Sequence, residues 1–455
     1  MEKQNLRKAK TTYIVPYENG KFVFLSNLTS KVMIGDTAVK DIVENPNSYL
    51  DSNPNVVKYL YENGFIVKNE AIESEILYTN FEKAKNDISL TFVLYLTLNC
   101  NFNCVYCFQG EENKNRNITF KKNDSELIVN FIKKKFDASD DEKLTLTLTG
   151  GEPLLKFPLI QEIVTKLESQ VGKNRLSTRL ISNGSLLDEE KCRFFEKHNW
   201  VSTQITMDGT EYYHNKMRPY RNGEGSFQDV IKGLDNALKY CKEVILRINV
   251  WPQNISGIND LLDYLKKNGY AEKSNLILGF HQIQNFCETI RDKLEGLTCS
   301  SSQWGLMSLK FHELARFKGF KNVDLPLSFP RMLHCGANSL KVFHILPDGR
   351  IATCWGTSGE MDDFVIGTIY DEKPNKAYLK NLETLKGYNP LNQDKCKKCE
   401  VFALCGGGCL AEALSENGDM SKSVCSNVKY DPEKYLTLFV KERLRKSKFS
   451  TRQFT

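Results

Sequence analysis

Residues 98–107 read Leu-Asn-Cys-Asn-Phe-Asn-Cys-Val-Tyr-Cys, so that Cys100, Cys104 and Cys107 are spaced C-x₃-C-x₂-C. They directly follow an apolar run that predicts a buried strand. Three thiolates on one short loop can bind three irons of a 4Fe–4S cube and leave the fourth iron open to a small chelating molecule. A zinc site is the alternative, but zinc takes four ligands, and no fourth cysteine or histidine lies near in the sequence.

From Leu90 onward, strand-like runs alternate with helix-like runs. The repeat predicts an α/β fold with a parallel sheet and crossover helices, a partial (β/α)6 TIM-like barrel. Chemistry in such folds takes place at the C-terminal ends of the strands, where the cysteine loop falls. The predicted strands are 91–98, 143–149, 178–182, 201–206, 243–250 and 275–280, and the predicted helices are 125–136, 158–171, 188–198, 227–240 and 258–267.

Polar motifs follow the next three predicted strands. Gly-Gly-Glu-Pro occupies 150–153, Ser-Asn-Gly occupies 182–184, and Thr-Met-Asp-Gly occupies 206–209, with His214 and Arg218 soon after. Glycines allow a backbone to approach a ligand closely, and a carboxylate can accept a hydrogen bond from an ammonium group. In this order and spacing, the motifs and the cysteine loop resemble the signature of the radical S-adenosylmethionine (radical SAM) superfamily.

The resemblance implies an enzyme that binds S-adenosylmethionine at the open iron of a 4Fe–4S cluster held by Cys100, Cys104 and Cys107. The implied chemistry is cleavage of the cofactor to a 5′-deoxyadenosyl radical, which takes a hydrogen atom from an unreactive carbon. By position, the family's cofactor contacts fall on Tyr106, Gly150, Gly151, Glu152, Pro153, Ser182, Asn183, Thr206 and Arg218.

A second group of cysteines lies in the last third of the chain. Seven of the fourteen cysteines fall between 335 and 425, around the glycines 406–408. In a cytosolic chain, thiols stay reduced, so such clusters indicate metal ligands before disulfides, and two zinc sites are the alternative to iron–sulfur clusters. The spacing resembles the seven-cysteine SPASM domain, which holds two auxiliary 4Fe–4S clusters and accompanies enzymes that modify peptides. These seven residues are Cys335, Cys354, Cys396, Cys399, Cys405, Cys409 and Cys425.

Carried over by position, an outer cluster takes Cys396, Cys399, Cys405 and Cys425, and an inner cluster takes Cys335, Cys354 and Cys409. The family often has one more cysteine before the first, yet the residues near Phe329 include none. Cys299, Cys287 or a substrate thiolate could supply the fourth inner ligand. We interpret the remaining cysteines as small buried hydrophobic residues without a ligand role; these are Cys192, Cys241 and Cys287.

The N-terminal residues 12–67 form a separate pattern. Strand-like runs at 12–15 and 21–25 flank a turn, helix-like runs follow at 37–43 and 55–62, and 64–67 could form a wing strand. This order resembles the winged-helix recognition element of ribosomal-peptide (RiPP) maturases, which bind a leader peptide as an added strand. The alternative is a generic α+β appendage. Residues 68–88 are expected to be a polar linker.

The composition is that of a soluble protein. The net charge of +6 comes from 62 Lys and Arg minus 56 Asp and Glu, and part of the excess lies in the C-terminal tail. We expect no nucleic-acid partner, no membrane span and no secretory signal, and therefore a cytoplasmic location. The predicted domains are 1–80 for peptide recognition, 89–300 for the radical SAM barrel, 330–430 for the SPASM domain and 431–455 for a C-terminal helix and basic tail.

The leading interpretation is a peptide maturase that forms a thioether cross-link between a cysteine and a nearby residue. A flavodoxin or ferredoxin is expected to reduce the enzyme. The alternatives are an anaerobic sulfatase-maturating enzyme, which makes formylglycine, and other SPASM chemistry such as carbon–carbon cross-linking or epimerisation. A non-catalytic iron–sulfur or zinc module is disfavoured by the cofactor motifs. The sequence leaves the oligomeric state open.

Overall fold

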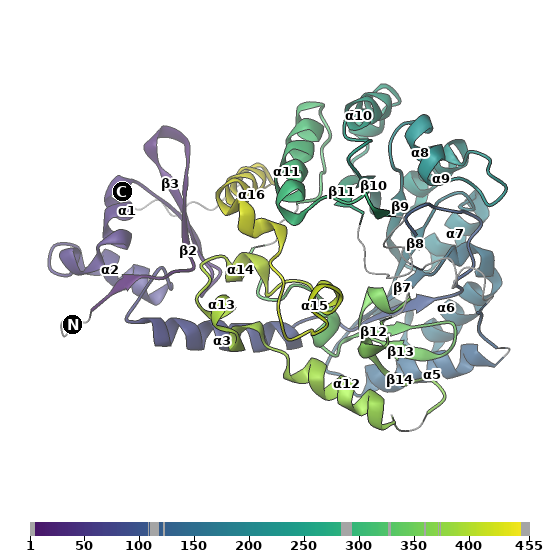
Figure 1. Ribbon diagram of the computed structural model, residues 1–455, viewed down its shortest axis with the longest axis horizontal. Coiled ribbons are helices and arrows are strands. Elements are labelled where there is room, and N and C mark those ends of the chain that lie inside the picture. The colour runs from purple at the N-terminus through teal and green to yellow at the C-terminus, as the bar shows by residue number, and fades with distance from the viewer. Residues whose placement is uncertain are drawn as a thin grey trace. The chain divides into compact units, whose positions relative to one another are not determined.

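The computed structural model describes residues 5–107, 109, 118–121, 123–283, 294–325, 329–358, 361–371, 373 and 375–446 (Figure 1). The chain divides into two compact units. The smaller comprises Met1–Asp87, Leu325–Cys335 and Asn389–Thr455, and the larger comprises Ile88–Asp324 and Gly336–Tyr388. In the described part, no helix is long and apolar enough to cross a membrane.

The larger unit is built on a sheet that has nine strands within the described residues, in the order β11-β10-β9-β8-β7-β6-β12-β13-β14. The strands from β11 to β12 are parallel to their neighbours, and β13 and β14 are antiparallel. This confirms the predicted partial (β/α)6 barrel. The strands are β6 (Thr91–Tyr95), β7 (Leu144–Thr149), β8 (Leu176–Ser182), β9 (Trp200–Thr206), β10 (Val244–Val250), β11 (Leu276–Gln282), β12 (Val342–Ile345), β13 (Arg350–Ala352) and β14 (Val365–Thr368).

Helices cover one face of these strands (Figure 1). Phe92 on β6 makes an edge-to-face contact with Phe131 on α5, and its register partner Leu146 shares that buried face. Because side chains alternate along a strand, the threonines of β7 point to the opposite face, toward the inside of the barrel. The helices are α5 (Asp124–Asp137), α6 (Phe157–Val171), α7 (Glu189–Lys197), α8 (Glu211–Met217), α9 (Phe227–Tyr240), α10 (Gly257–Lys267), α11 (Ser301–Phe317) and α12 (Lys376–Gly387).

The predicted strands and helices of the barrel are confirmed, with small shifts at their ends. The largest shift is in the first strand, which ends at Tyr95 rather than Leu98. Beyond Tyr95 the backbone still follows the end of β7, since Leu96 N donates to Thr149 O and Thr97 O accepts from Gly151 N. The helices α8, α11 and α12 were not predicted. The strands β12–β14 were also missed, because short strands among glycines and cysteines carry little periodicity.

The smaller unit begins with a three-stranded antiparallel sheet in the order β2-β3-β4. The expected hairpin and helices are present, but β4 was not predicted, and the expected wing strand pairs with β1 instead of extending the hairpin. Phe24, Val57 and Phe65 lie in a buried core shared by these elements. The elements are β1 (Arg7–Lys8), β2 (Thr12–Pro16), β3 (Phe22–Ser26), β4 (Val32–Gly35), α1 (Thr37–Glu44), α2 (Pro54–Glu62) and β5 (Ile66–Val67).

Residues 68–88, expected to be a linker, are mostly helical: α3 spans Glu70–Asn86. The Asn69 side chain caps the helix by accepting from Ile72 N at 2.9 Å. Phe81 on α3 is buried and contacts Phe402, so the cysteine-rich C-terminal segment packs on this helix. The remaining helices of the unit are α13 (Asp394–Lys397), α14 (Phe402–Cys405), α15 (Leu410–Asn417) and α16 (Pro432–Lys446).

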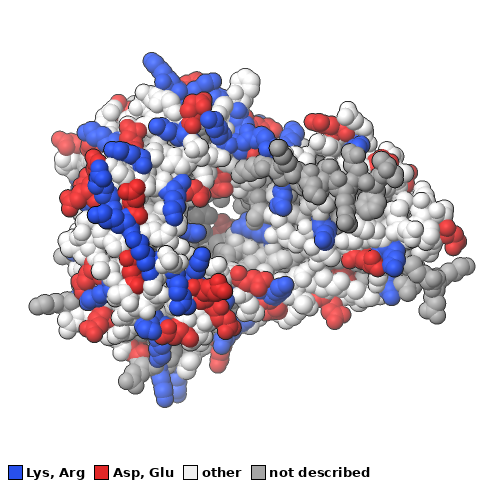
Figure 2. All heavy atoms as spheres, turned by 180° about the vertical axis from the view of Figure 1, so that it is seen from behind, with Lys and Arg blue, Asp and Glu red and all other residues white. Residues whose placement is uncertain are grey.

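Positive and negative side chains are interspersed on the face shown in Figure 2. That mixture agrees with the small net charge of +6. A protein that binds nucleic acid usually gathers its basic side chains into one patch or stripe. The expectation of no nucleic-acid partner stays a prediction.

Glu73 ties α3 to the N-terminal strand. It is fully buried and accepts from Arg7 Nη2 at 2.7 Å and from Thr11 N and Oγ1 at 3.1 Å. We expect Glu73→Ala to lower the free energy of unfolding by about 1–3 kcal/mol, because the substitution leaves buried donors without an acceptor. Glu75→Ala, on the exposed side of the same helix, is the control. Equal denaturation midpoints for the two variants would contradict this role.

Candidate active site

Backbone hydrogen bonds on two sides hold the cysteine loop 98–107 in place. On one side, the loop and the preceding Thr97 bond to residues 151 and 152, which follow β7. On the other side, the loop bonds to residues 217–221, which begin at the last residue of α8. The loop is therefore attached to the rim of the barrel by its backbone on both sides. The bonds are Gly151 N to Thr97 O (2.8 Å), Glu152 N to Asn99 O (2.9 Å), Asn103 N to Pro219 O (2.8 Å), Val105 N to Met217 O (3.0 Å) and Arg221 N to Asn101 O (3.0 Å).

Gly150 and Gly151 permit the first of these contacts. A Cβ atom on Gly150 would lie 2.3 Å from Thr97 O, and one on Gly151 would lie 2.3 Å from Asn99 O. Gly150 also has a φ of 144°, which L side chains rarely adopt. The structure shows that these glycines let the strand end approach the cysteine loop, and the expected approach of a ligand to them stays a prediction.

Glu152 is fully buried and joins the ends of β7 and β8. Its carboxylate accepts from Leu154 N at 3.0 Å, from Ser182 Oγ at 2.9 Å and from Asn183 N at 2.8 Å. Burial raises the pKa of Glu152 to about 7, although these hydrogen bonds favour the ionised form. Pro153 then begins a short 3-10 helix that Glu152 caps. The motif positions 152, 153, 182 and 183 therefore form one hydrogen-bonded unit.

The thiol of Cys100 lies beside this unit. Its Sγ accepts from Phe102 N at 3.4 Å and from Asn183 Nδ2 at 3.7 Å. Burial raises the pKa of Cys100 to about 12, with smaller contributions from a nearby carboxylate and from the thiols of Cys104 and Cys107. A bound cation would reverse that shift, because a coordinating thiol is deprotonated.

Among the described residues, no three cysteine, histidine or carboxylate side chains are placed to hold one metal ion. The ligands of a 4Fe–4S cube each bind a different iron. The cluster ligands therefore stay a prediction from the spacing.

Tyr106 is the centre of a buried polar network at the ends of β9 and β10. Its hydroxyl donates to Asp208 Oδ2. The same hydroxyl accepts from Arg218 Nη1 at 2.8 Å and from Asn249 Nδ2 at 2.8 Å. Arg247 Nε in turn donates to Asn249 Oδ1 at 2.9 Å. Burial raises the pKa of Tyr106, so its hydroxyl keeps its proton. The network brings the predicted residues Tyr106 and Arg218 together.

The sequence did not assign roles to Asp208, Arg247 or Asn249. Asp208 was part of a quoted motif, and the other two lie on the barrel-interior side of β10. Polar residues within an otherwise apolar strand, near its C-terminal end, were the signal that could have found them. The predicted Thr206 ends β9 opposite Arg247 in the sheet register. His214, which was part of the same motif, accepts from Asp208 N at 3.4 Å and contacts Ser226 Oγ at 3.1 Å.

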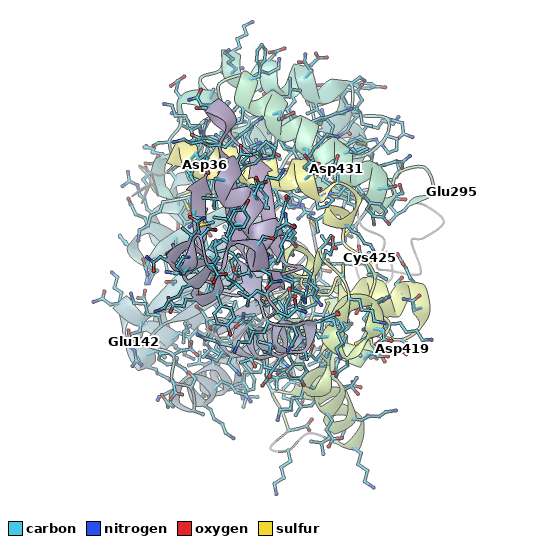
Figure 3. The ribbon with its side chains drawn as sticks, turned by 90° about the vertical axis from the view of Figure 1, so that its left-hand side faces the viewer. Asp36, Glu142, Glu295, Asp419, Cys425 and Asp431 are labelled. Carbon is cyan, nitrogen blue, oxygen red and sulfur yellow. The ribbon has the colours of Figure 1, made fainter. Side chains whose placement is uncertain are left out.

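In the smaller unit, the segment that carries the C-terminal cysteines is compact. Burial, together with the thiols of Cys405 and Cys399, raises the pKa of Cys396. Cys425 is exposed (Figure 3), and its Sγ accepts from Lys429 Nζ at 3.5 Å. The four predicted ligands of the outer cluster thus lie in one region of the fold.

Two of the predicted inner ligands also lie in the smaller unit. Burial raises the pKa of Cys409 to about 12, and the neighbouring thiol of Cys335 contributes to the shift. Cys354 belongs to the larger unit, where its Sγ accepts from Gly356 N at 3.4 Å. Cys299 is half-buried, and Cys287 lies outside the described residues. Cys192 and Cys241 are buried, as expected.

Residues 94–265 match the model of the Radical SAM superfamily. A cysteine-type anaerobic sulfatase-maturating enzyme of Clostridium novyi is 25% identical over 359 residues, which are 74% of this chain and 93% of that relative. The radical SAM cyclopropyl synthase TigE of Paramaledivibacter caminithermalis is 22% identical over 420 residues, or 84% of this chain and 83% of that relative.

Two solved structures share the fold. Native anSMEcpe with bound AdoMet and Kp18Cys peptide has a TM-score of 0.61 at 17% identity, and the match covers 79% of this chain and 99% of that chain. Streptococcus suis SuiB bound to precursor peptide SuiA has a TM-score of 0.51 at 13% identity, covering 90% of this chain and 97% of that chain. This chain therefore contains a radical SAM domain, and the protein is an enzyme. Its relatives include anaerobic sulfatase-maturating enzymes and a radical SAM cyclopropyl synthase.

The residues of the site fit adenosylmethionine. Asp208 Oδ1 and Arg218 Nε are buried and have no partner among the described residues. One is an acceptor and the other a donor, and the methionine part of the cofactor carries both an ammonium and a carboxylate. Beside them, the ring of Tyr106 packs with Met217 and Trp251, which offers an apolar surface to an adenine.

The glycine contact can be tested by one substitution. We expect Gly151→Ala to lower the free energy of unfolding by about 1–3 kcal/mol and to reduce iron incorporation, because the added methyl group overpacks the cysteine loop. Gly367→Ala is the matched control, since nothing lies within 4 Å of a Cβ there and its φ is not positive. The measurements are chemical denaturation and iron content after anaerobic reconstitution. Wild-type iron content in Gly151→Ala would contradict the predicted link.

Proposed function

We propose that this enzyme modifies a precursor peptide by forming a thioether between a cysteine sulfur and a carbon of a nearby residue. The observation that carries the radical chemistry is the pair of unpartnered buried atoms, Asp208 Oδ1 and Arg218 Nε, beside a loop of three cysteines. A bound cluster and adenosylmethionine would supply a 5′-deoxyadenosyl radical, which removes a hydrogen atom from the peptide.

The chain's own residues would bind and orient the cofactor. Cys100, Cys104 and Cys107 would hold the cluster, and Arg218 would pair with the cofactor's carboxylate. Asp208 would accept from the ammonium group through its unpartnered Oδ1, whereas the oxygens of Glu152 already accept from protein donors. The tyrosine hydroxyl between Asp208 and Arg218 fixes both side chains. Six further residues would contact the cofactor, as the sequence predicts: Gly150, Gly151, Pro153, Ser182, Asn183 and Thr206.

Two further clusters are proposed for the seven C-terminal cysteines. For each thioether, the peptide loses a hydrogen atom to the deoxyadenosyl group, a thiol proton to solvent and one electron. The cysteines would hold clusters that take up this electron, and a flavodoxin or ferredoxin would supply the electron that starts each turnover. The proposed ligand sets are Cys396, Cys399, Cys405 and Cys425 for the outer cluster and Cys335, Cys354 and Cys409 for the inner one.

The smaller unit supports a peptide substrate. Its sheet β2-β3-β4 has open edges within the described residues, and a leader peptide can bind such an edge as an added strand. SuiB is described with a bound precursor peptide, and its structure covers more of this chain than anSMEcpe does, 90% against 79%. This difference favours a peptide maturase with a recognition unit.

Formylglycine formation is the second candidate, because the Clostridium novyi relative is matched over 93% of its length. Mass spectrometry separates the two. Reduced, reconstituted enzyme is incubated with adenosylmethionine and either a cysteine-containing peptide encoded beside its gene or a sulfatase-derived peptide. A loss of two hydrogens with loss of the free thiol in the first peptide supports thioether formation. Conversion of a cysteine or serine to an aldehyde in the second peptide supports the alternative and overturns the proposal.

The three proposed clusters also predict iron contents. We expect the triple variant Cys100→Ala, Cys104→Ala, Cys107→Ala to lose about one third of the iron and all 5′-deoxyadenosine formation, since each cube contains four irons. Cys192→Ala is the control, because that buried thiol is assigned to packing. Iron analysis and product chromatography make the test. An iron-free triple variant would refute the auxiliary clusters.

A further inference from the structure

The side chain of one buried histidine in the larger unit makes no hydrogen bond to any described residue. His344 lies on β12 and is 1% exposed, and neither of its ring nitrogens has a partner among the described residues. Its ring packs edge-on against Trp355, with ring centres 4.8 Å apart, and lies 6.0 Å from the ring of Tyr95. An imidazole placed among aromatic rings without a polar partner is costly, because burial removes its hydrogen bonds to water.

Two more polar groups without partners lie close by in the same part of the fold. Thr353 and Thr357 are 2% and 0% exposed, and neither hydroxyl oxygen has a partner among the described residues. They flank Cys354. In the antiparallel pairing of β12 with β13, His344 is opposite Ala352, two residues before this cysteine.

These three side chains carry four buried atoms without a partner among the described residues, and all three belong to the stretch of fold that holds Cys354. A buried polar atom that nothing satisfies loses its hydrogen bonds to water without replacement, so such atoms indicate where another group could bind. All three side chains can donate a hydrogen bond. The group that would satisfy them is therefore an acceptor bound next to Cys354, and the sulfur atoms of an iron–sulfur cluster are acceptors.

We propose that His344, together with the hydroxyls of Thr353 and Thr357, donates hydrogen bonds to the cluster bound by Cys354 and raises its reduction potential. The inference rests on the proposed function, which assigns Cys354 as a ligand. Hydrogen bonds to the sulfurs are among the factors that set the potential of such clusters, and they stabilise the reduced form because it carries more negative charge. Gly356 N already donates to Cys354 Sγ in this way.

The surrounding rings fix the direction of the imidazole. Tyr95 ends β6, and its hydroxyl donates to Trp355 O at 3.5 Å, so it packs on His344 and contacts the residue that follows Cys354. A raised potential would make this cluster the better acceptor for the electron that the peptide gives up.

The test uses the triple variant without Cys100, Cys104 and Cys107, so that the remaining signals come from auxiliary clusters. Loss of a signal in Cys354→Ala identifies the relevant cluster. A redox titration followed by electron paramagnetic resonance then compares His344→Phe, which keeps the ring shape, with His344→Gln, which keeps a donor. Phe343→Leu is the matched control: it lies on the same strand and packs on Phe92 on the opposite face.

We expect His344→Phe to lower the reduced fraction of this cluster about tenfold at fixed ambient potential, equivalent to about 59 mV for one electron. His344→Gln should recover part of the shift, and Thr357→Val should lower the potential by less. Iron content should stay unchanged. A potential in His344→Phe equal to that in Phe343→Leu would overturn the proposal, as would loss of iron, which would make the histidine a ligand.

The same series separates failure of this inference from failure of the proposed function. If the triple variant binds no iron, or Cys354→Ala loses no signal, the assignment of Cys354 fails and the inference fails with it. If the signal is present and does not respond to His344, the inference alone fails.

Discussion

The site depends on one close contact between two stretches of backbone. The end of β7 lies against the cysteine loop so tightly that a methyl group on Gly150 or Gly151 would overlap carbonyl oxygens of that loop. This contact orients the chain so that Glu152 turns inward and accepts from the end of β8. Since Asn183 at that end donates to Cys100 Sγ, the contact also sets the surroundings of the first thiol. The glycine pair therefore acts on the site through packing, before any ligand is considered.

Buried polar atoms without a partner among the described residues indicate where other groups could bind. Most buried donors and acceptors in a folded protein are paired, so an unpaired set carries information. At the ends of β9 and β10, the leftover atoms of Asp208 and Arg218 have opposite hydrogen-bonding character and suit a zwitterion. Around Cys354, the side chains of His344, Thr353 and Thr357 are all able to donate, which suits an anionic cluster. The two regions thus differ in the kind of group that they can accept.

The sequence predicted the barrel well because its helices and strands repeat with clear periods; the helix Phe227–Tyr240 has the predicted bounds. It failed where tertiary contacts override periodicity. The helix α3 has charged residues around most of its surface and is held by the burial of a few residues such as Leu77 and Phe81. The network around Tyr106 could not be predicted for another reason. Asp208 follows β9 and Asn249 lies on β10, and a spacing pattern cannot show that the two side chains share one hydroxyl.

In the second cysteine segment, as in the first, glycines allow two stretches of backbone to lie in close contact. Gly406 and Gly408 both have a positive φ, and a Cβ on them would lie 2.6 Å from His334 N and 1.8 Å from Val424 O. Gly408 thereby holds the backbone before Cys409 against the residue before Cys425. In both segments, glycine allows two stretches of chain to meet beside a cysteine, so backbone contact helps to position thiols such as Cys100 and Cys409. A side chain at Gly151 or Gly408 would push the two stretches apart and displace the cysteine beside it.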